Sequence, residues 1–163
     1  MLKSTQLKSL LNNIDISYQQ ETNNNKALLW AKMAIIEVGG WTEECIDELL
    51  NNYIDYKNPN CKNELKELIK RNYGFDYSRN FRNICVQILG NLIFEKIEKR
   101  IPVDCRRLEL ALNGLKNNRN RCAHTHILNN SPIDAPHITV SQLNDIEAGL
   151  KKFKKELKKI ILN

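Results

Sequence analysis

The sequence contains few of the residues that interrupt helices, with 6 glycines and 4 prolines among its 163 residues. The prolines, Pro59, Pro102, Pro132 and Pro136, all stand where stretches of helical periodicity end or begin. Strand-rich folds need frequent tight turns, so this scarcity favours an all-α protein. A chain of this length can bury one core, and we expect a single helical domain over residues 1–163.

Features of secreted and membrane proteins are also scarce. Cysteine occurs five times, at Cys45, Cys61, Cys85, Cys105 and Cys122, without any Cys-x-x-Cys pair. An odd number of widely spaced cysteines argues against a disulfide framework or a structural zinc ribbon. No apolar run followed by small residues marks a signal peptide, and the most apolar stretch, 27–41, contains Lys32 and Glu37. We therefore expect a cytoplasmic protein without membrane attachment.

The chain is basic, with a formal net charge of +6 and a pI near 9.1. A basic surface attracts polyanions, so nucleic acid or an anionic membrane is a permitted partner. Six lysines between residues 151 and 159 contribute to this charge. Such a run is more often the solvated face of a helix than a groove for RNA.

Apolar residues recur at three- to four-residue spacing along most of the chain, which predicts amphipathic helices. The expected helices cover residues 3–20, 26–53, 58–73, 78–101, 104 to near 124, and 139–160. Joined by short loops, they should form a compact up-and-down bundle of five to six helices.

Local signals suggest where individual helices start or weaken. Ser78 and Asp104 are of the residue types preferred as N-caps, and residues 139–142 match a capping box. The glycine pair at 39–40 weakens the second helix and predicts a kink or a close helix crossing there.

Most of the sequence is scaffold, and the exception is the stretch LKNNRNRCAHTHI at residues 115–127. Two of the three histidines and two arginines fall within eight positions of one another. On a helix, Asn120 and His124 share a face, whereas Arg119 and His124 lie about 140° apart. Arg119 and His124 would converge if the arginine bends round the helix or if the helix loosens near His124.

These residue types suit RNA cleavage. A base must remove the 2′-hydroxyl proton, an acid must protonate the leaving 5′-oxygen, and a cation must stabilise the phosphorane. His124 can serve as acid or base near neutral pH, and Arg119 supplies a permanent cation that matches phosphate oxygens. Asn120 can orient a ring or a phosphate. A two-fold dimer would bring two such sets to one cleft, and no metal or cofactor is needed.

The string from Arg119 to His124, RNRCAH, resembles the Arg-x4-His motif of HEPN domains, including the polar residue after the arginine and the small one before the histidine. The upstream stretch 27–50 is similar to that family's first long core helix. The resemblance implies a compact helical bundle and a metal-independent endoribonuclease that leaves 2′,3′-cyclic phosphate ends. It also implies RNA as substrate, a homodimer, and an antitoxin or phage-defence partner protein.

The resemblance makes Arg119, His124 and Asn120 the candidate catalytic residues. Lys116, Arg121 and His126 are candidate substrate-binding residues. One branch of the family has tyrosine two residues after the motif histidine, where this chain has His126. Control by modification of that tyrosine is therefore not carried over.

Several alternatives remain open. Arginine and histidine at the polar end of a helix are often solvated surface or caps. Cys122, His124 and His126 suggest a metal site, although the three cannot all converge on one helix and no fourth ligand is evident. The chain is alternatively a non-catalytic HEPN module that binds RNA, a nucleotide or a protein partner, or a helical interaction module. Glu37 or Glu43 could pair with Arg119, or both could lie at the surface.

Overall fold

The structure, a computed structural model, describes residues 3–57, 60–124 and 133–162. These residues form seven α-helices and one short π-helical segment, which confirms the all-α prediction. In chain order the elements are α1 (Thr5–Gln20), α2 (Asn24–Lys57), α3 (Lys62–Lys70), η1 (Tyr77–Arg82), α4 (Asn83–Leu89), α5 (Asn91–Arg100), α6 (Pro102–His124) and α7 (Pro136–Leu162).

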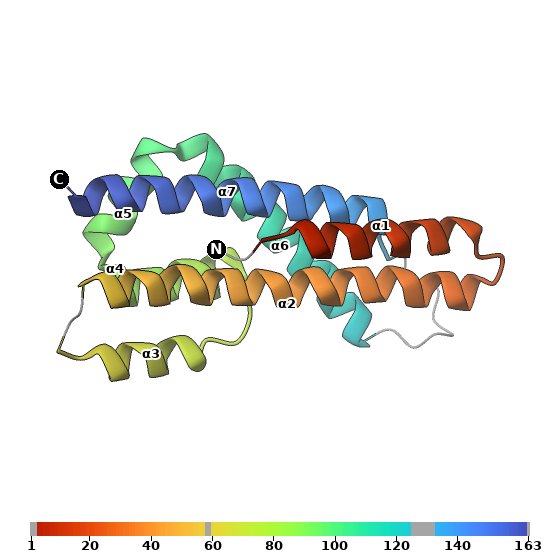
Figure 1. Cartoon of the computed structure of the whole chain (residues 1–163), viewed down its shortest axis with the longest axis horizontal. Helices are drawn as coiled ribbons and strands as arrows, with labels where there is room; N and C mark the ends of the chain where they lie inside the picture. The colour runs from red at the N-terminus through yellow and green to blue at the C-terminus, as the bar shows by residue number, and fades with distance from the viewer. Residues whose placement is uncertain (1–2, 58–59, 125–132, 163) are drawn as a thin grey trace.

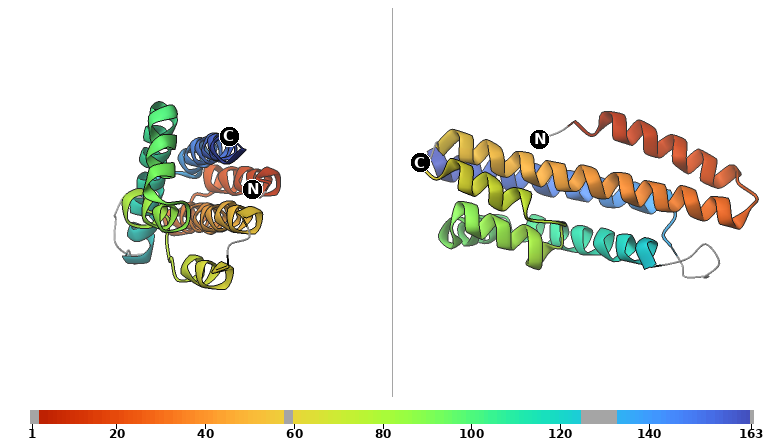
Figure 2. Two further views of the ribbon diagram at one scale, coloured as in Figure 1. Left: turned by 90° about the vertical axis from the view of Figure 1, so that its left-hand side faces the viewer. Right: turned by 90° about the horizontal axis from the view of Figure 1, so that it is seen from below.

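Four helices, α1, α2, α6 and α7, build the body of the molecule (Figure 1). Helices α2 and α7 run in the same direction, and α1 and α6 run against them, which is the up-and-down arrangement (Figure 2). Helices α3, α4 and α5 and segment η1 form an excursion between α2 and α6. The shorter elements therefore cover one end of the bundle that the four long helices form.

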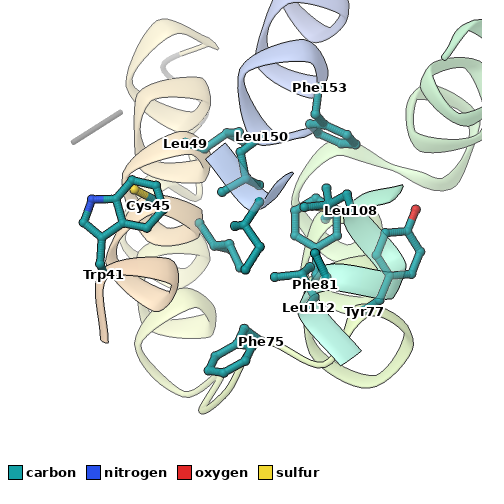
Figure 3. Close-up of a cluster of buried hydrophobic side chains, with 14 of the residues drawn as sticks. Trp41, Cys45, Leu49, Phe75, Tyr77, Phe81, Leu108, Leu112, Leu150 and Phe153 are labelled. Carbon is teal, nitrogen blue, oxygen red and sulfur yellow. The ribbon is translucent and has the colours of Figure 1, made fainter. Parts of the chain in front are cut away.

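The core is one continuous cluster of buried side chains to which every α-helix contributes. Figure 3 shows residues of α2, η1, α6 and α7 meeting at its centre. Phe81 and Phe153 pack edge to face with ring centroids 5.3 Å apart, and both are fully buried. Along α7 the apolar seam that the sequence predicts is buried at Leu143, Ile146, Leu150, Phe153 and Leu157. Burial of this seam, rather than helix propensity alone, holds α7 in place.

Two helix starts in the middle of the chain differ from those expected. Asp76, not Ser78, caps the next helix, because its Oδ1 accepts a hydrogen bond from the Arg79 amide at 2.9 Å. Helix α6 starts at Pro102, so Asp104 lies in its first turn rather than at its cap. Proline suits the first position of a helix, where its missing N–H costs nothing.

The expected helix 78–101 is divided at Gly90. This residue has a φ of +88°, a conformation that L side chains rarely adopt, and it ends α4 and precedes α5. Glycine adopts such a φ without the steric cost of a Cβ. The chain turns between α4 and α5 for that reason.

The expected capping box at residues 139–142 is wrong. Helix α7 begins one turn earlier, at Pro136, which again occupies a helix start. Thr139 is fully buried within the helix, and its hydroxyl has no hydrogen-bond partner among the described residues. A buried threonine inside a helix cannot serve as an N-cap.

Candidate functional site

The candidate segment forms the C-terminal part of α6, which remains α-helical up to His124. The helix thus covers Arg119 to His124, and any loosening past His124 lies outside the described residues. Its backbone places the Arg119 and His124 positions about 140° apart around the helix axis. The His124 side chain and the whole of His126 lie outside the described part of the chain, so their roles stay predictions.

Arg119 lies against α2 and has two partners, Glu43 of α2 and Phe75 of the connection between α3 and η1. Its Nη1 donates a hydrogen bond to Glu43 Oε1 at 2.6 Å, and its Cζ stands 5.2 Å from the centroid of the Phe75 ring. The contact combines a charge-assisted hydrogen bond with a cation–π interaction. The side chain nevertheless stays 42% exposed. Arg119 is thus held by two contacts while part of its side chain remains exposed to solvent.

Of the two carboxylates that the sequence leaves open as partners, Glu43 is the one that pairs with Arg119. Glu37 is exposed and lines a shallow depression beside α1, together with Leu7 and Trp41. Glu43 and Gly39 are four residues apart and share the face of α2 that Arg119 crosses. The Arg119 pair therefore links α2 to α6 at the level of the glycine pair.

The glycine pair does not kink or break α2, which continues through 34 residues. Helix α2 nevertheless comes close to Arg119 at Gly39. A Cβ built on this residue would stand 3.6 Å from Arg119 Cδ and 3.5 Å from Phe75 Cε1. These are ordinary van der Waals distances, so the arrangement does not require glycine there.

Lys116 lies on the same side of α6 as Arg119 but already has a partner. Its Nζ stands 3.5 Å from Asp76 Oδ2. The backbone hydrogen bond from Arg79, together with the Lys116 charge, lowers the pKa of the Asp76 carboxyl. Lys116 therefore ties α6 to the start of η1, and a substrate phosphate would have to compete with Asp76 for it.

The other predicted residues on α6 point elsewhere. Arg121 is exposed and lies about 160° around the helix from Arg119, so one chain does not bring the two arginines together. Asn120 is exposed, about 100° from Arg119. Buried Asn118 donates a hydrogen bond to Asp134 Oδ2 at 2.6 Å and fixes the chain just before α7. Within one chain, the structure assembles Arg119 and Lys116 but not Arg121.

Sequence reasoning missed two residues that shape the site. Lys32 of α2 donates a hydrogen bond from Nζ to the Cys122 carbonyl at 3.3 Å, near the end of α6 where the helix dipole favours a cation. A lysine inside the apolar stretch 27–41 was the available signal. Phe75 lies between α3 and η1, outside any helical pattern, so no signal pointed to it.

Asp47, one helical turn beyond Glu43, adds a second carboxyl to this region. Its burial, followed by the nearby charges of Glu43 and Glu44, raises its pKa from 3.8 to about 6. At neutral pH the Asp47 carboxyl is mostly ionised, although its burial and the two neighbouring carboxylates disfavour that charge. This side of α2 is therefore acidic apart from the cation that Arg119 brings.

Replacing Asp47 with asparagine should make the protein more stable at neutral pH. A raised pKa means that the folded state binds the proton more tightly than the unfolded state. The protonated Asp47 carboxyl therefore stabilises the folded state fully below about pH 4, and this contribution is lost as the pH rises through about 6. We expect Asp47→Asn to increase the free energy of unfolding by on the order of 1 kcal/mol at pH 7.5, after allowance for solvent screening. Urea unfolding near pH 4 should show no such gain.

The described residues form neither a metal-binding cluster nor a membrane-spanning helix. Within residues 3–57, 60–124 and 133–162, no group of three or more His, Cys, Asp or Glu side chains is placed to hold a metal ion. Burial raises the pKa of Cys122, which disfavours the thiolate that a metal would bind. No helix in these ranges is both long and apolar enough to cross a bilayer. The metal alternative depends on His124 and His126 and stays untested.

No protein-family model, curated protein or solved structure matches this chain. The resemblance to HEPN domains therefore stays a prediction that rests on the residues from Arg119 to His124.

Proposed function

We propose that this protein is a metal-independent endoribonuclease in which Arg119 and His124 act on the scissile phosphate. The observation that carries the proposal is the setting of Arg119. Arg119, on the helix that ends at His124, is oriented by Glu43 and Phe75 while its side chain stays 42% exposed.

The proposed reaction needs no co-reactant other than RNA. One histidine accepts the 2′-hydroxyl proton while the 2′-oxygen attacks phosphorus. A second histidine donates a proton to the leaving 5′-oxygen, and a 2′,3′-cyclic phosphate remains. Arg119 stabilises the negative charge that develops on the phosphoryl oxygens. Asn120, in the turn before His124, orients the histidine ring or the phosphate.

The proposed site is shared between two copies of the chain. Because α6 is regular, Arg119 faces α2 and the His124 position lies about 140° away, so the pair is poorly placed to converge within one protomer. A two-fold axis near the end of α6 would place Arg119 of one protomer beside His124 of its partner. Two histidines in one cleft also supply the separate base and acid that the reaction needs. Arg121 and His126 would then contact RNA around that cleft.

We further propose that the protein acts in the cytoplasm as a toxin or defence effector, with an antitoxin or defence protein as its partner. The cysteines are free, as expected for a reducing compartment. The toxin or defence role and the antitoxin or defence partner rest on the resemblance of residues 119–124 to the HEPN motif.

Replacing Glu43 with alanine should lower kcat for RNA cleavage by roughly ten- to hundredfold, because Arg119 loses the contact that orients it. KM should change little, since the cation itself remains. Glu43→Gln keeps an acceptor for the Arg119 N–H and should restore part of kcat. The matched control is Glu37→Ala, which removes an exposed carboxylate from the same helix away from Arg119. Equal losses in the Glu37 and Glu43 variants would contradict the positioning role.

The test of the proposed function is a cleavage assay with end-labelled single-stranded RNA in excess EDTA. The proposal predicts cleavage by the purified protein, with products ending in 2′,3′-cyclic phosphate. Intact RNA under all conditions, or cleavage that stops in EDTA, would contradict it. A DNA oligonucleotide of the same sequence should stay intact, because it lacks the attacking 2′-hydroxyl.

A second candidate is a non-catalytic module that binds RNA, a nucleotide or a protein partner. The ion pair of Arg119 with Glu43 favours this candidate over catalysis, because a guanidinium already neutralised by a carboxylate stabilises developing phosphoryl charge less well. Binding of intact RNA that weakens steeply with salt, without cleavage, would select it.

A further inference from the structure

Helix α1 occupies only part of the groove between α2 and α7. It packs against both helices, and the three lie side by side over one half of the bundle (Figures 1 and 2). The start of α1 is fixed on α7, where Glu147 accepts hydrogen bonds from Ser4 Oγ at 2.9 Å and Lys8 Nζ at 2.8 Å. Burial would raise the pKa of Glu147, but hydrogen bonds from Lys151, Lys8 and Ser4 lower it to about 2. The groove therefore accepts a helix, and an ion pair fixes that helix at its first turn.

The same groove continues past the start of α1. Residues 154 and 158 lie two and three turns beyond Glu147, on the same face of α7. The face of α7 that α1 covers therefore extends beyond α1 to these two residues. A cavity of about 390 Å³ occupies this part of the groove, open to solvent and uncovered by the described residues. Its lining residues are Leu49, Asn52, Tyr53, Tyr56, Lys154, Leu157, Lys158, Ile161 and Leu162.

The floor of this open groove is apolar and its outer parts are accessible. Leu49 and Leu157 are buried at its base, whereas Tyr56 is 61% exposed and Leu162 is 72% exposed. Large apolar side chains that line an open groove in a monomer are typical of a surface that binds a partner. Two parallel helices also form the trough that a third helix needs.

The charges along α7 reverse at the point where α1 begins. Beneath α1 the face presents Glu147, which pairs with a lysine of α1. Beyond it the face presents Lys154 and Lys158, which form no ion pair among the described residues, although Lys151 and Lys159 each have one. Glu48 of α2 lies within electrostatic range of Lys154. The α7 side of the open groove therefore offers two cations where the occupied part offers an anion. Its occupant should carry acidic residues at the matching positions.

We propose that this open groove binds an amphipathic helix of a partner protein, with an apolar ridge flanked by Asp or Glu. The ridge would lie on Leu49, Leu157 and Ile161, and its carboxylates would face Lys154 and Lys158. The apolar floor favours such a helix over RNA, and the open trough that already takes α1 favours it over a small apolar ligand. The surface involves none of the residues assigned to RNA cleavage, so it stands independently of that function.

The test uses two designed fluorescein-labelled helical peptides on the intact protein, measured by fluorescence anisotropy. Both carry leucines at i, i+4, i+7 and i+11; one has flanking glutamates and the other has lysines at the same positions. The glutamate peptide should bind at least about tenfold more tightly. Charge reversal of Lys154→Glu together with Lys158→Glu should invert that preference. The control pair Lys152→Glu and Lys155→Glu, on other faces of α7, should leave it unchanged.

Three results would overturn the proposal. The first is that neither peptide binds, and the second is that both bind equally to the unaltered protein. The third is that the control pair changes the preference as much as the groove pair does. If oleate or a short single-stranded RNA binds in a Lys154- and Lys158-dependent way while neither peptide does, the groove takes a lipid or nucleic acid, and the partner-helix proposal is wrong. Circular dichroism of each variant confirms that the helices are retained.

Discussion

Replacing His124 or Arg119 with alanine is expected to reduce RNA cleavage by at least about a hundredfold in each case, with the fold retained. Loss of a general acid or base typically costs this much or more, and so does loss of a group that stabilises transition-state charge. Removing Arg119 leaves Glu43 without its ion pair, but that carboxylate is 38% exposed and can be solvated. The loss of stability should therefore be no more than about 1 kcal/mol.

The matched control for Arg119→Ala is Arg121→Ala. Both arginines lie in the same region of α6, and Arg119 is the one that pairs with Glu43 of α2. We expect Arg121→Ala to raise KM modestly and to leave kcat within about threefold of the unaltered protein, because a rim charge contributes mainly to association. Initial rates on labelled RNA, with thermal unfolding of each variant, measure both effects. Full activity in Arg119→Ala would remove the basis of the proposed mechanism.

Replacing Gly149 with alanine should destabilise the protein by about 1–3 kcal/mol, because α6 and α7 touch at this residue. A Cβ built on Gly149 would stand 2.8 Å from Leu108 Cβ and 3.1 Å from Leu108 Cδ1. Leu108 is only 1% exposed and packed on all sides, so it has little room to move. Urea unfolding followed by circular dichroism at 222 nm and extrapolated linearly to water measures the loss.

Gly40→Ala provides the control for this effect. Gly40 is exposed in the middle of α2, and a Cβ there would meet nothing within 4 Å. Alanine is the better helix former, so this variant should gain roughly 0.5–1 kcal/mol. If Gly149→Ala were as stable as Gly40→Ala, the close approach of α6 and α7 would be wrong.

The helical composition and the buried seam of α7 could be predicted because both depend on local periodicity. Division of the expected helix 78–101 at Gly90 could not, since a single glycine is tolerated in many helices and only the packing of α4 and α5 selects its positive φ. The start of α7 was misplaced because two local signals competed. Pro136 started the helix, and burial of Thr139 removed its side chain from capping.

The candidate site was only partly predictable for a similar reason. The sequence identified Arg119 and offered two carboxylates on α2 as partners. The choice of Glu43 depends on where α6 crosses α2, which no local pattern specifies. Phe75 reaches Arg119 from the connection after α3, so its role also follows from tertiary packing. The position of Arg121, far round α6 from Arg119, follows from the regularity of that helix up to His124.

The central claim is that Arg119 of one protomer and His124 of its partner act together on one phosphate. Its most direct test is to coexpress Arg119→Ala and His124→Ala chains with different affinity tags and to purify the mixed dimer. Each mixed dimer keeps one Arg119 and one His124, on different chains. The comparison is a dimer of one unaltered chain with one Arg119→Ala/His124→Ala chain, which also keeps one Arg119 and one His124 but on the same chain. Both dimers lack the second histidine and should be slower than the unaltered protein. The claim predicts that the dimer with the pair on different chains cleaves RNA in EDTA faster than the dimer with the pair on one chain. The reverse order of rates would show that the pair acts within one chain and would contradict the shared site.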